Sequence, residues 1–196
     1  MLNNSRPMLT SRRTSLVVLM ACSIALQAAV PKGWLIAGSR PADYESGTDL
    51  AAAHNGHPSA YLKSITPQVP GFGTLMQDFR ADHYLGKRVR FSAFVKTETA
   101  RDWAGLWMRV DKESKQVAFD NMQSRPIKGT TNWQKYDVVL DVPHDATGIF
   151  FGILLSGSGK VWLNDAKFEI VDITVPTTDA GMVQGRDEPT NLDFEK

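Results

Sequence analysis

Cysteine is almost absent from this sequence, since the single Cys22 lies in an apolar stretch near the N-terminus. The rest of the chain therefore has neither disulfides nor cysteine-based metal sites, and its stability must come from a hydrophobic core. With 196 residues, of which 42% are hydrophobic, the chain is long enough for one ordinary domain or at most two small ones.

An excess of charge of either sign is also lacking. The chain has 22 Lys and Arg against 21 Asp and Glu, a formal net charge of +1, and the basic residues after the first 13 positions are scattered. Because no positive stripe suits a phosphate backbone, we expect no nucleic-acid partner.

Local catalytic motifs are missing as well. The Gly157–Lys160 run has Leu154 where a phosphate loop requires its first glycine and Val161 where it requires Ser or Thr, so it predicts a turn. Ser156 and Ser158 lack the pattern of a nucleophile elbow. Four histidines fall in loop-like stretches without metal-binding spacing: His54, His57, His83 and His144. The sequence thus predicts no enzyme and no transition metal, although carboxylates from distant strands could still meet in space.

Residues 1–30 have the layout of a targeting segment. Arg6, Arg12 and Arg13 precede the apolar run 16–30, and Pro31 ends it. This arrangement is typical of a secretory signal peptide, and the run is shorter than the roughly 20 residues that span a bilayer comfortably. We therefore expect export to the periplasm, cell envelope or medium through a cleaved signal, with an uncleaved anchor as the alternative.

Two finer interpretations of this segment stay open. The stretch 11–16 (SRRTSL) resembles a twin-arginine signal, with Ser15 in the usual aromatic position. The stretch 19–22 (LMAC) resembles a bacterial lipobox, in which Cys22 would be lipidated, while Ala28 and Ala29 offer a rival cleavage point. We expect membrane contact only through this segment or through a lipid on Cys22.

From residue 31 onward, period-2 alternation replaces any helical period. Val89, Phe91, Ala93 and Val95 share one face of a predicted strand over 88–96. In the next predicted strand, 103–110, Leu106, Met108 and Val110 make an aliphatic face and Trp103, Trp107 and Arg109 make the opposite face. Residues 111–115 are typical of a hairpin turn, and 117–122 of the strand that follows it.

Further strands are predicted over 133–142, 148–155 and 160–171, with a turn at 156–159. The run 148–155 (GIFFGILL) is apolar on both faces, which favours a central strand covered on each side. About eight short strands separated by turns predict an all-β sandwich, specifically a jelly roll, over residues 31–173. Residues 174–196 are expected to be a loosely ordered tail with a possible terminal strand.

Several of these segments resemble the galactose-binding-like jelly rolls, which include carbohydrate-binding modules. The resemblance rests on Gly33–Ser39, Tyr61-Leu62 and Trp103–Val110, and above all on the hairpin 150–168 that contains VWLNDAKFEIV. The run from AGLWMRVD to YDVVLDVP also resembles domains of uncharacterised bacterial proteins, some attached to transcriptional regulators. The resemblance implies a non-catalytic domain and a structural calcium ion with Asp165 and Glu195 among its ligands.

One segment departs from that pattern. A stretch like Asn191–Glu195 usually forms the first strand of such modules, whereas here it stands at the C-terminus. It could pair beside the N-terminal strand, or it could be the vestige of a second domain.

The face formed by Trp103, Trp107 and Arg109 is the best candidate for a binding surface. An aromatic plate beside forked donors and carboxylates suits the C–H faces and hydroxyls of a sugar. Alternation places Asn121 opposite Asp120, so both cannot line one groove without a bulge. The predicted ligand-binding set is Trp103, Trp107, Arg109, Asp120, Gln123 and Arg125.

Three functions compete. The leading hypothesis is an exported, non-catalytic domain that binds carbohydrate or another small polar ligand. The second is a structural or protein-interaction module of the envelope, which predicts that Trp107 is buried and that no groove lies on its side of the sheet. The third is a glycan-active enzyme, which requires several polar groups converging in a pocket.

Overall fold

The computed structural model describes residues 29–179, which form a β-sandwich with one short 3₁₀ turn, η1, at Pro41–Asp43. The strands are β1 (Leu35–Gly38), β2 (Tyr44–His54), β3 (His57–Ser64), β4 (Phe72–Arg80), β5 (Arg88–Lys112), β6 (Lys115–Asp120), β7 (Ile127–Asp141), β8 (Gly148–Ser156) and β9 (Lys160–Val171). The all-β jelly-roll prediction is thereby confirmed. Within the described part of the chain, no helix is long and apolar enough to cross a bilayer.

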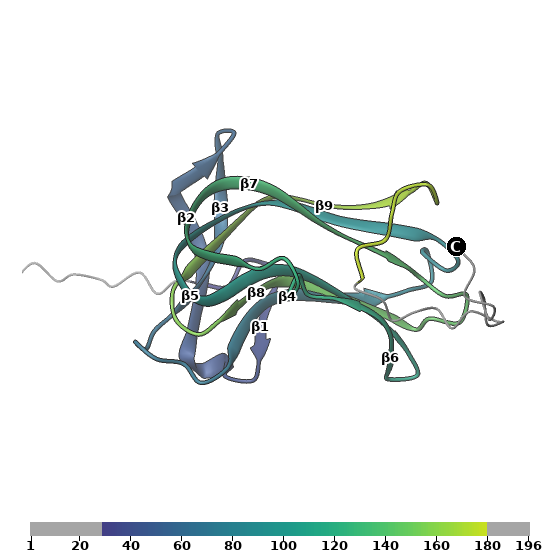
Figure 1. Cartoon of the computed structure of the whole chain (residues 1–196), viewed down its shortest axis with the longest axis horizontal. Coiled ribbons are helices and arrows are strands. Elements are labelled where there is room, and N and C mark those ends of the chain that lie inside the picture. The colour runs from purple at the N-terminus through teal and green to yellow at the C-terminus, as the bar shows by residue number, and fades with distance from the viewer. Residues whose placement is uncertain (1–28, 180–196) are drawn as a thin grey trace, which may run out of the picture.

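The strands form two layers, which face each other in Figure 1. In the lower layer, β1 pairs with β4, β4 with β8, β8 with the second half of β5, and that half of β5 with β6. In the upper layer, β2 pairs with β3, β3 with β9, and β9 with the first half of β5, which also pairs with β7. All of these pairs are antiparallel.

Strand β5 belongs to both layers. Its residues 88–98 pair with β9, and its residues 103–111 pair with β8. The two strands predicted over 88–96 and 103–110 are therefore the two halves of one long strand that bends between sheets, with register shifts where it turns. This bend holds the layers together by the covalent chain as well as by packing.

The core lies between the layers, where the inward faces of both sheets meet. The aliphatic faces predicted for β5 lie there: Val89, Phe91, Ala93, Val95, Leu106, Met108 and Val110 are all completely buried. From β8, Ile149, Ile153 and Leu155 pack against them. Burial of apolar surface on this scale is the main stabilising contribution in a domain without disulfides.

Candidate functional groove

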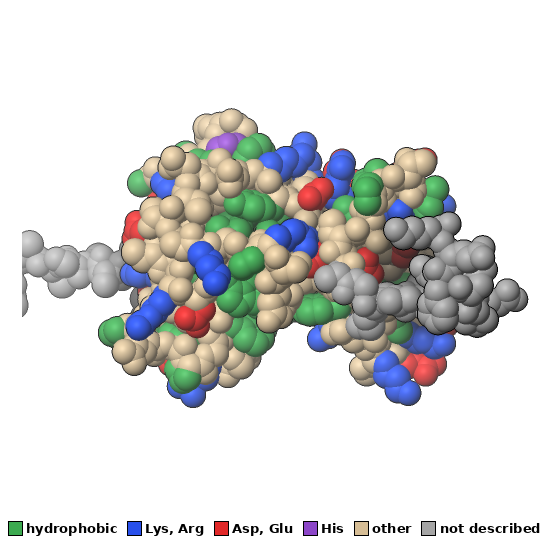
Figure 2. All heavy atoms as spheres, viewed as in Figure 1, with side chains coloured by type: hydrophobic (Ala, Val, Ile, Leu, Met, Phe, Trp, Pro, Cys, Tyr) green, Lys and Arg blue, Asp and Glu red, His purple; other side chains and the backbone are tan. Residues whose placement is uncertain are grey.

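A groove of about 510 Å³ lies on the outer face of the lower sheet, away from the core. Phe72 on β4, Ser156 on β8 and Trp103 on β5 stand side by side at one end of it, as the register of the strands requires. In Figure 2 the lower outline is indented between the lobe with β1 and the lobe with the β5–β6 hairpin. The residues that line the groove are Ala37, Gly38, Phe72, Thr74, Met76, Trp103, Trp107, Arg109, Gln116, Phe119, Asn121, Phe150, Leu154 and Ser156.

Trp107 forms the floor of this groove. Its side chain is only 8% exposed and packs with Met76 and Leu154 in a small apolar cluster separate from the main core. Its indole N–H donates a 2.7 Å hydrogen bond to the hydroxyl of Thr74, which in turn donates to the carbonyl oxygen of Ile153. Trp107 is thus held in one orientation, and little of its side chain is open to the groove.

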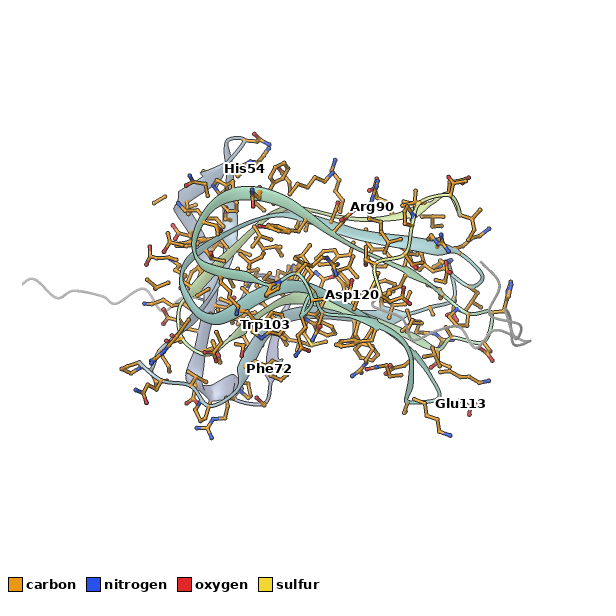
Figure 3. The ribbon with its side chains drawn as sticks, in the orientation of Figure 1. His54, Phe72, Arg90, Trp103, Glu113 and Asp120 are labelled. Atoms are coloured by element: carbon orange, nitrogen blue, oxygen red, sulfur yellow. The ribbon has the colours of Figure 1, made fainter. Side chains whose placement is uncertain are left out.

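Trp103 is the more accessible tryptophan. It is half-buried, packs against the same apolar cluster, and lies beside Gly105 two positions along the same face of β5. A Cβ atom at Gly105 would lie 3.2 Å from the Trp103 ring and 3.0 Å from Cβ of Met122. The glycine therefore makes room for the indole to lie against the sheet, close to Phe72 in Figure 3. This is the geometry of an aromatic platform.

Arg109 stands at the other end of the groove. Its guanidinium lies over the ring of Phe150, with Cζ 4.4 Å from the ring centroid. Its Nε atom is 2.9 Å from Oδ1 of Asp111, although the N–H does not point at that oxygen. Since the side chain remains 37% exposed, the stacked guanidinium faces the groove as a fixed donor.

Strand β6 closes the side of the groove with Gln116 and Phe119, and Asn121, directly after the strand, lines the groove beside them. Asp120 points the other way, opposite Met108 in the register, and Figure 3 shows it away from the lower face. The alternation predicted that Asn121 and Asp120 lie on opposite faces, and the structure confirms this: Asn121 lines the groove and Asp120 does not. Gln116 and Asn121 were not in the predicted set, although the same alternation could have found Asn121.

Asp120 and Arg125 form an ion pair beside the groove. The Nη2 and Nη1 atoms of Arg125 lie 2.6 and 3.1 Å from the two carboxylate oxygens of Asp120, and the Asp120 side chain is 5% exposed. Asp120 also accepts the backbone N–H of Met122 and so shapes the turn after β6. Neither residue lines the groove, nor does the exposed Gln123. Three of the six predicted residues are therefore brought together: Trp103, Trp107 and Arg109.

Asp165 lies on the upper layer, far from the groove. Its Oδ2 accepts hydrogen bonds from Nδ2 of Asn55 at 3.0 Å and from Nδ1 of His54 at 3.1 Å. These bonds, that from Asn55 first, lower the pKa of the carboxyl group. The ring of His54 packs on Phe94, so the β2–β3 hairpin is fastened to the upper sheet.

The predicted metal and lipid sites remain predictions. The hydrogen-bond partners of Asp165 are nitrogen atoms of His54 and Asn55. Calcium prefers oxygen ligands, so these two groups are not a calcium ligand set. Residues 29–179 contain no group of three or more His, Cys, Asp or Glu side chains that could hold a metal. Glu195 and Cys22, together with the strand-like segment 191–195, lie outside the described residues.

Solved structures with the same fold include carbohydrate-binding modules. The CBM22-1 xylan-binding domain of Xyn10C from Paenibacillus barcinonensis has a TM-score of 0.51 at 13% identity, covering 74% of this chain and 90% of that one. The C-terminal family 22 module of Xyn10B from Clostridium thermocellum has a TM-score of 0.51 at 14% identity, covering 71% and 87%. The Stig cyclase Fisc from Fischerella sp. TAU scores 0.51 at 10% identity, covering 74% and 89%. At such identities the likeness shows the fold alone.

A curated relative is much closer in sequence. The chain is 51% identical over 168 residues to the uncharacterized HTH-type transcriptional regulator YbfP of Bacillus subtilis (strain 168), and this match covers 84% of the chain. The chain spans only 57% of the length of that relative. No family model matches the chain.

Proposed function

We propose that this domain is a non-catalytic carbohydrate-binding module that takes a saccharide in the groove of the lower sheet. The observation that carries the proposal is the groove itself, with Trp103 as an accessible aromatic platform and Arg109, Gln116 and Asn121 as polar groups around it. Sugars stack their C–H faces on such platforms and exchange hydrogen bonds with amide and guanidinium groups. The proposal is also supported by solved structures of the same fold, which include a xylan-binding domain and a carbohydrate-binding module.

The chemistry of the groove supports binding rather than catalysis. Of the described residues, 29–179, none that lines the groove is a carboxylate, histidine or cysteine, so these lining residues supply no general acid–base pair. Glycoside hydrolysis generally requires two carboxyl groups within roughly 10 Å of each other across the substrate. A glycan-active enzyme is therefore the weaker alternative.

The alternative of a structural or protein-interaction module requires a buried Trp107 and a sheet face without a groove. Trp107 is indeed buried. The groove nevertheless exists on its side of the sheet, because Trp107 forms the floor. The proposal of a small-ligand site therefore rests on Trp103 and not on Trp107.

The test is binding of the purified protein to a panel of oligosaccharides, followed by calorimetry on those that bind. We expect Trp103→Ala to weaken binding by about tenfold or more, as for a central aromatic contact. Trp133→Ala, which removes a half-buried tryptophan of β7 outside the groove, is the matched control and should leave affinity unchanged. Absence of binding to every saccharide, or equal affinity of Trp103→Ala and the unchanged protein, would refute the proposal.

We further propose that the chain is exported through residues 1–30, so that the domain meets its saccharide outside the cytoplasm. The support is the order of the arginines, the apolar run and Pro31 in the sequence.

A further inference from the structure

Within residues 29–179, Arg109 is the one charged side chain that lines the groove. We propose that it selects saccharides that carry a carboxylate, that is, uronic-acid residues. This inference rests on the proposed carbohydrate-binding function and specifies which class of sugar the groove prefers.

The orientation of Arg109 is fixed before any ligand arrives. Stacking on Phe150 at 4.4 Å restrains the guanidinium plane, and the Asp111 carboxylate, 2.9 Å from Nε, attracts its inner end as an ion pair without a hydrogen bond. Asp111 is 6% exposed and does not line the groove, so it steadies the arginine from behind. A preorganised guanidinium loses less side-chain entropy on binding than a free one.

The outer end of the guanidinium is left for a ligand. No protein group in residues 29–179 forms a hydrogen bond with Nη1 or Nη2 of Arg109, whereas both Nη atoms of Arg125 are bonded to Asp120. Two parallel N–H donors in a plane match the two oxygens of a carboxylate. A neutral hydroxyl group accepts from one donor at a time and brings no opposite charge, so it forms a weaker pair with the guanidinium.

The neighbouring side chains fit the rest of an acidic sugar. Phe119 lies directly opposite Arg109 on β6, and Gln116 of the same strand and Asn121, directly after it, also line the groove. The amide groups can exchange hydrogen bonds with ring hydroxyls, while Trp103 at the far end takes a further sugar unit. Within residues 29–179 no carboxylate lines the groove, and the nearest one described, that of Asp111, lies on the far side of the guanidinium.

The experiment compares matched pairs of oligosaccharides, each acidic member beside its own methyl ester. Tetragalacturonic acid and a glucuronic-acid-substituted xylo-oligosaccharide are the acidic probes, and the affinities come from calorimetry with the purified protein. We expect each acid to bind about tenfold or more tightly than its ester, because a charge-assisted bidentate pair is lost on esterification.

Arg109→Gln should abolish this preference, so that each acid and its ester bind with equal affinity. Arg109→Lys should keep only a small part of it, because the ammonium group lacks the planar fork. Arg80→Gln removes the same charge from a fully solvated position at the end of β4, 84% exposed and paired with Asp82, and should change nothing.

Equal affinity for acid and ester, or a preference that survives Arg109→Gln, would overturn the inference. If saccharides still bind and Trp103→Ala still lowers their affinity, the proposed carbohydrate-binding function stands and only the uronic-acid preference is refuted. Binding of sulfated sugars in place of uronic acids also overturns the carboxylate assignment. If no saccharide of either kind binds, both proposals fail together.

Discussion

Replacement of Trp107 by Phe separates the structural role of this residue from binding. The variant keeps an aromatic ring on the floor of the groove but removes the N–H that donates to Thr74 at 2.7 Å. A buried hydrogen bond of this kind contributes about 1 kcal/mol to stability. The missing ring atoms leave a small cavity that costs about 1 kcal/mol more. We therefore expect the free energy of unfolding to fall by about 2 kcal/mol.

Urea unfolding of four proteins isolates the hydrogen bond: the unchanged chain, Trp107→Phe, Thr74→Val and the double variant. We expect a coupling energy of about 1 kcal/mol, because either single change already breaks the bond. Trp133→Phe is the control, since no hydrogen bond of its indole is found in residues 29–179. A coupling energy below about 0.3 kcal/mol would refute the reasoning. Trp107→Phe should change saccharide affinity less than Trp103→Ala does.

Three further predictions concern other parts of the chain. Burial raises the pKa of Tyr44 to about 12. The buried, neutral phenol therefore contributes fully to stability below pH 10, and this contribution is lost as the pH rises toward 12. It amounts to at most about 3 kcal/mol. The free energy of unfolding, measured between pH 8 and 12, should therefore fall less steeply with pH for Tyr44→Phe than for the unchanged chain. The same pH dependence in both proteins would contradict this. Asp120→Asn breaks the ion pair with Arg125 and should lower the free energy of unfolding by about 2 kcal/mol in urea titrations, with saccharide affinity unchanged; a loss of affinity at full stability would instead place Asp120 in the site. Mass spectrometry of the exported protein should show that residues 1 to about 30 have been removed, and Cys22→Ser should not alter its distribution between membrane and soluble fractions; release from the membrane by that variant would favour the lipoprotein.

Local alternation predicted the sandwich and the faces of its strands. The GIFFGILL run of β8 and the opposite faces of β5 follow directly from the period of two. Strand β2 was not predicted, because its sequence YESGTDLAAAH shows no sustained alternation and its order depends on pairing with β3. The continuity of β5 through its bend was not predicted either. Residues 97–102 show no alternation, and they form part of the strand only because it passes from one sheet to the other there.

The groove was only half predictable. Trp103, Trp107 and Arg109 lie on one strand, so one face of β5 is enough to find them. Phe72 and Phe150 come from β4 and β8, and no local pattern says that these strands lie beside β5 in the order that the register shows. Asp120 and Arg125 were predicted as ligand contacts because they are polar and close in sequence. A positive φ of 61° at Met122 turns the chain and lets them pair with each other instead.

The apolar character of β8 bears on where the ligand lies. Both faces of this strand are apolar, which from the sequence alone predicts cover on both sides. Ile149, Ile153 and Leu155 are covered by the core, and on the other face Phe150 and Leu154 line the groove. Leu154 is only 7% exposed because it packs with Met76 and Trp107, whereas Phe150 is half-buried. Apolar surface left exposed to water is costly, and a large patch of it commonly marks a binding site. The sheet face that the sequence predicts to be covered therefore coincides with the groove, and under the proposed function a stacked sugar would cover the apolar surface that Phe150 leaves exposed.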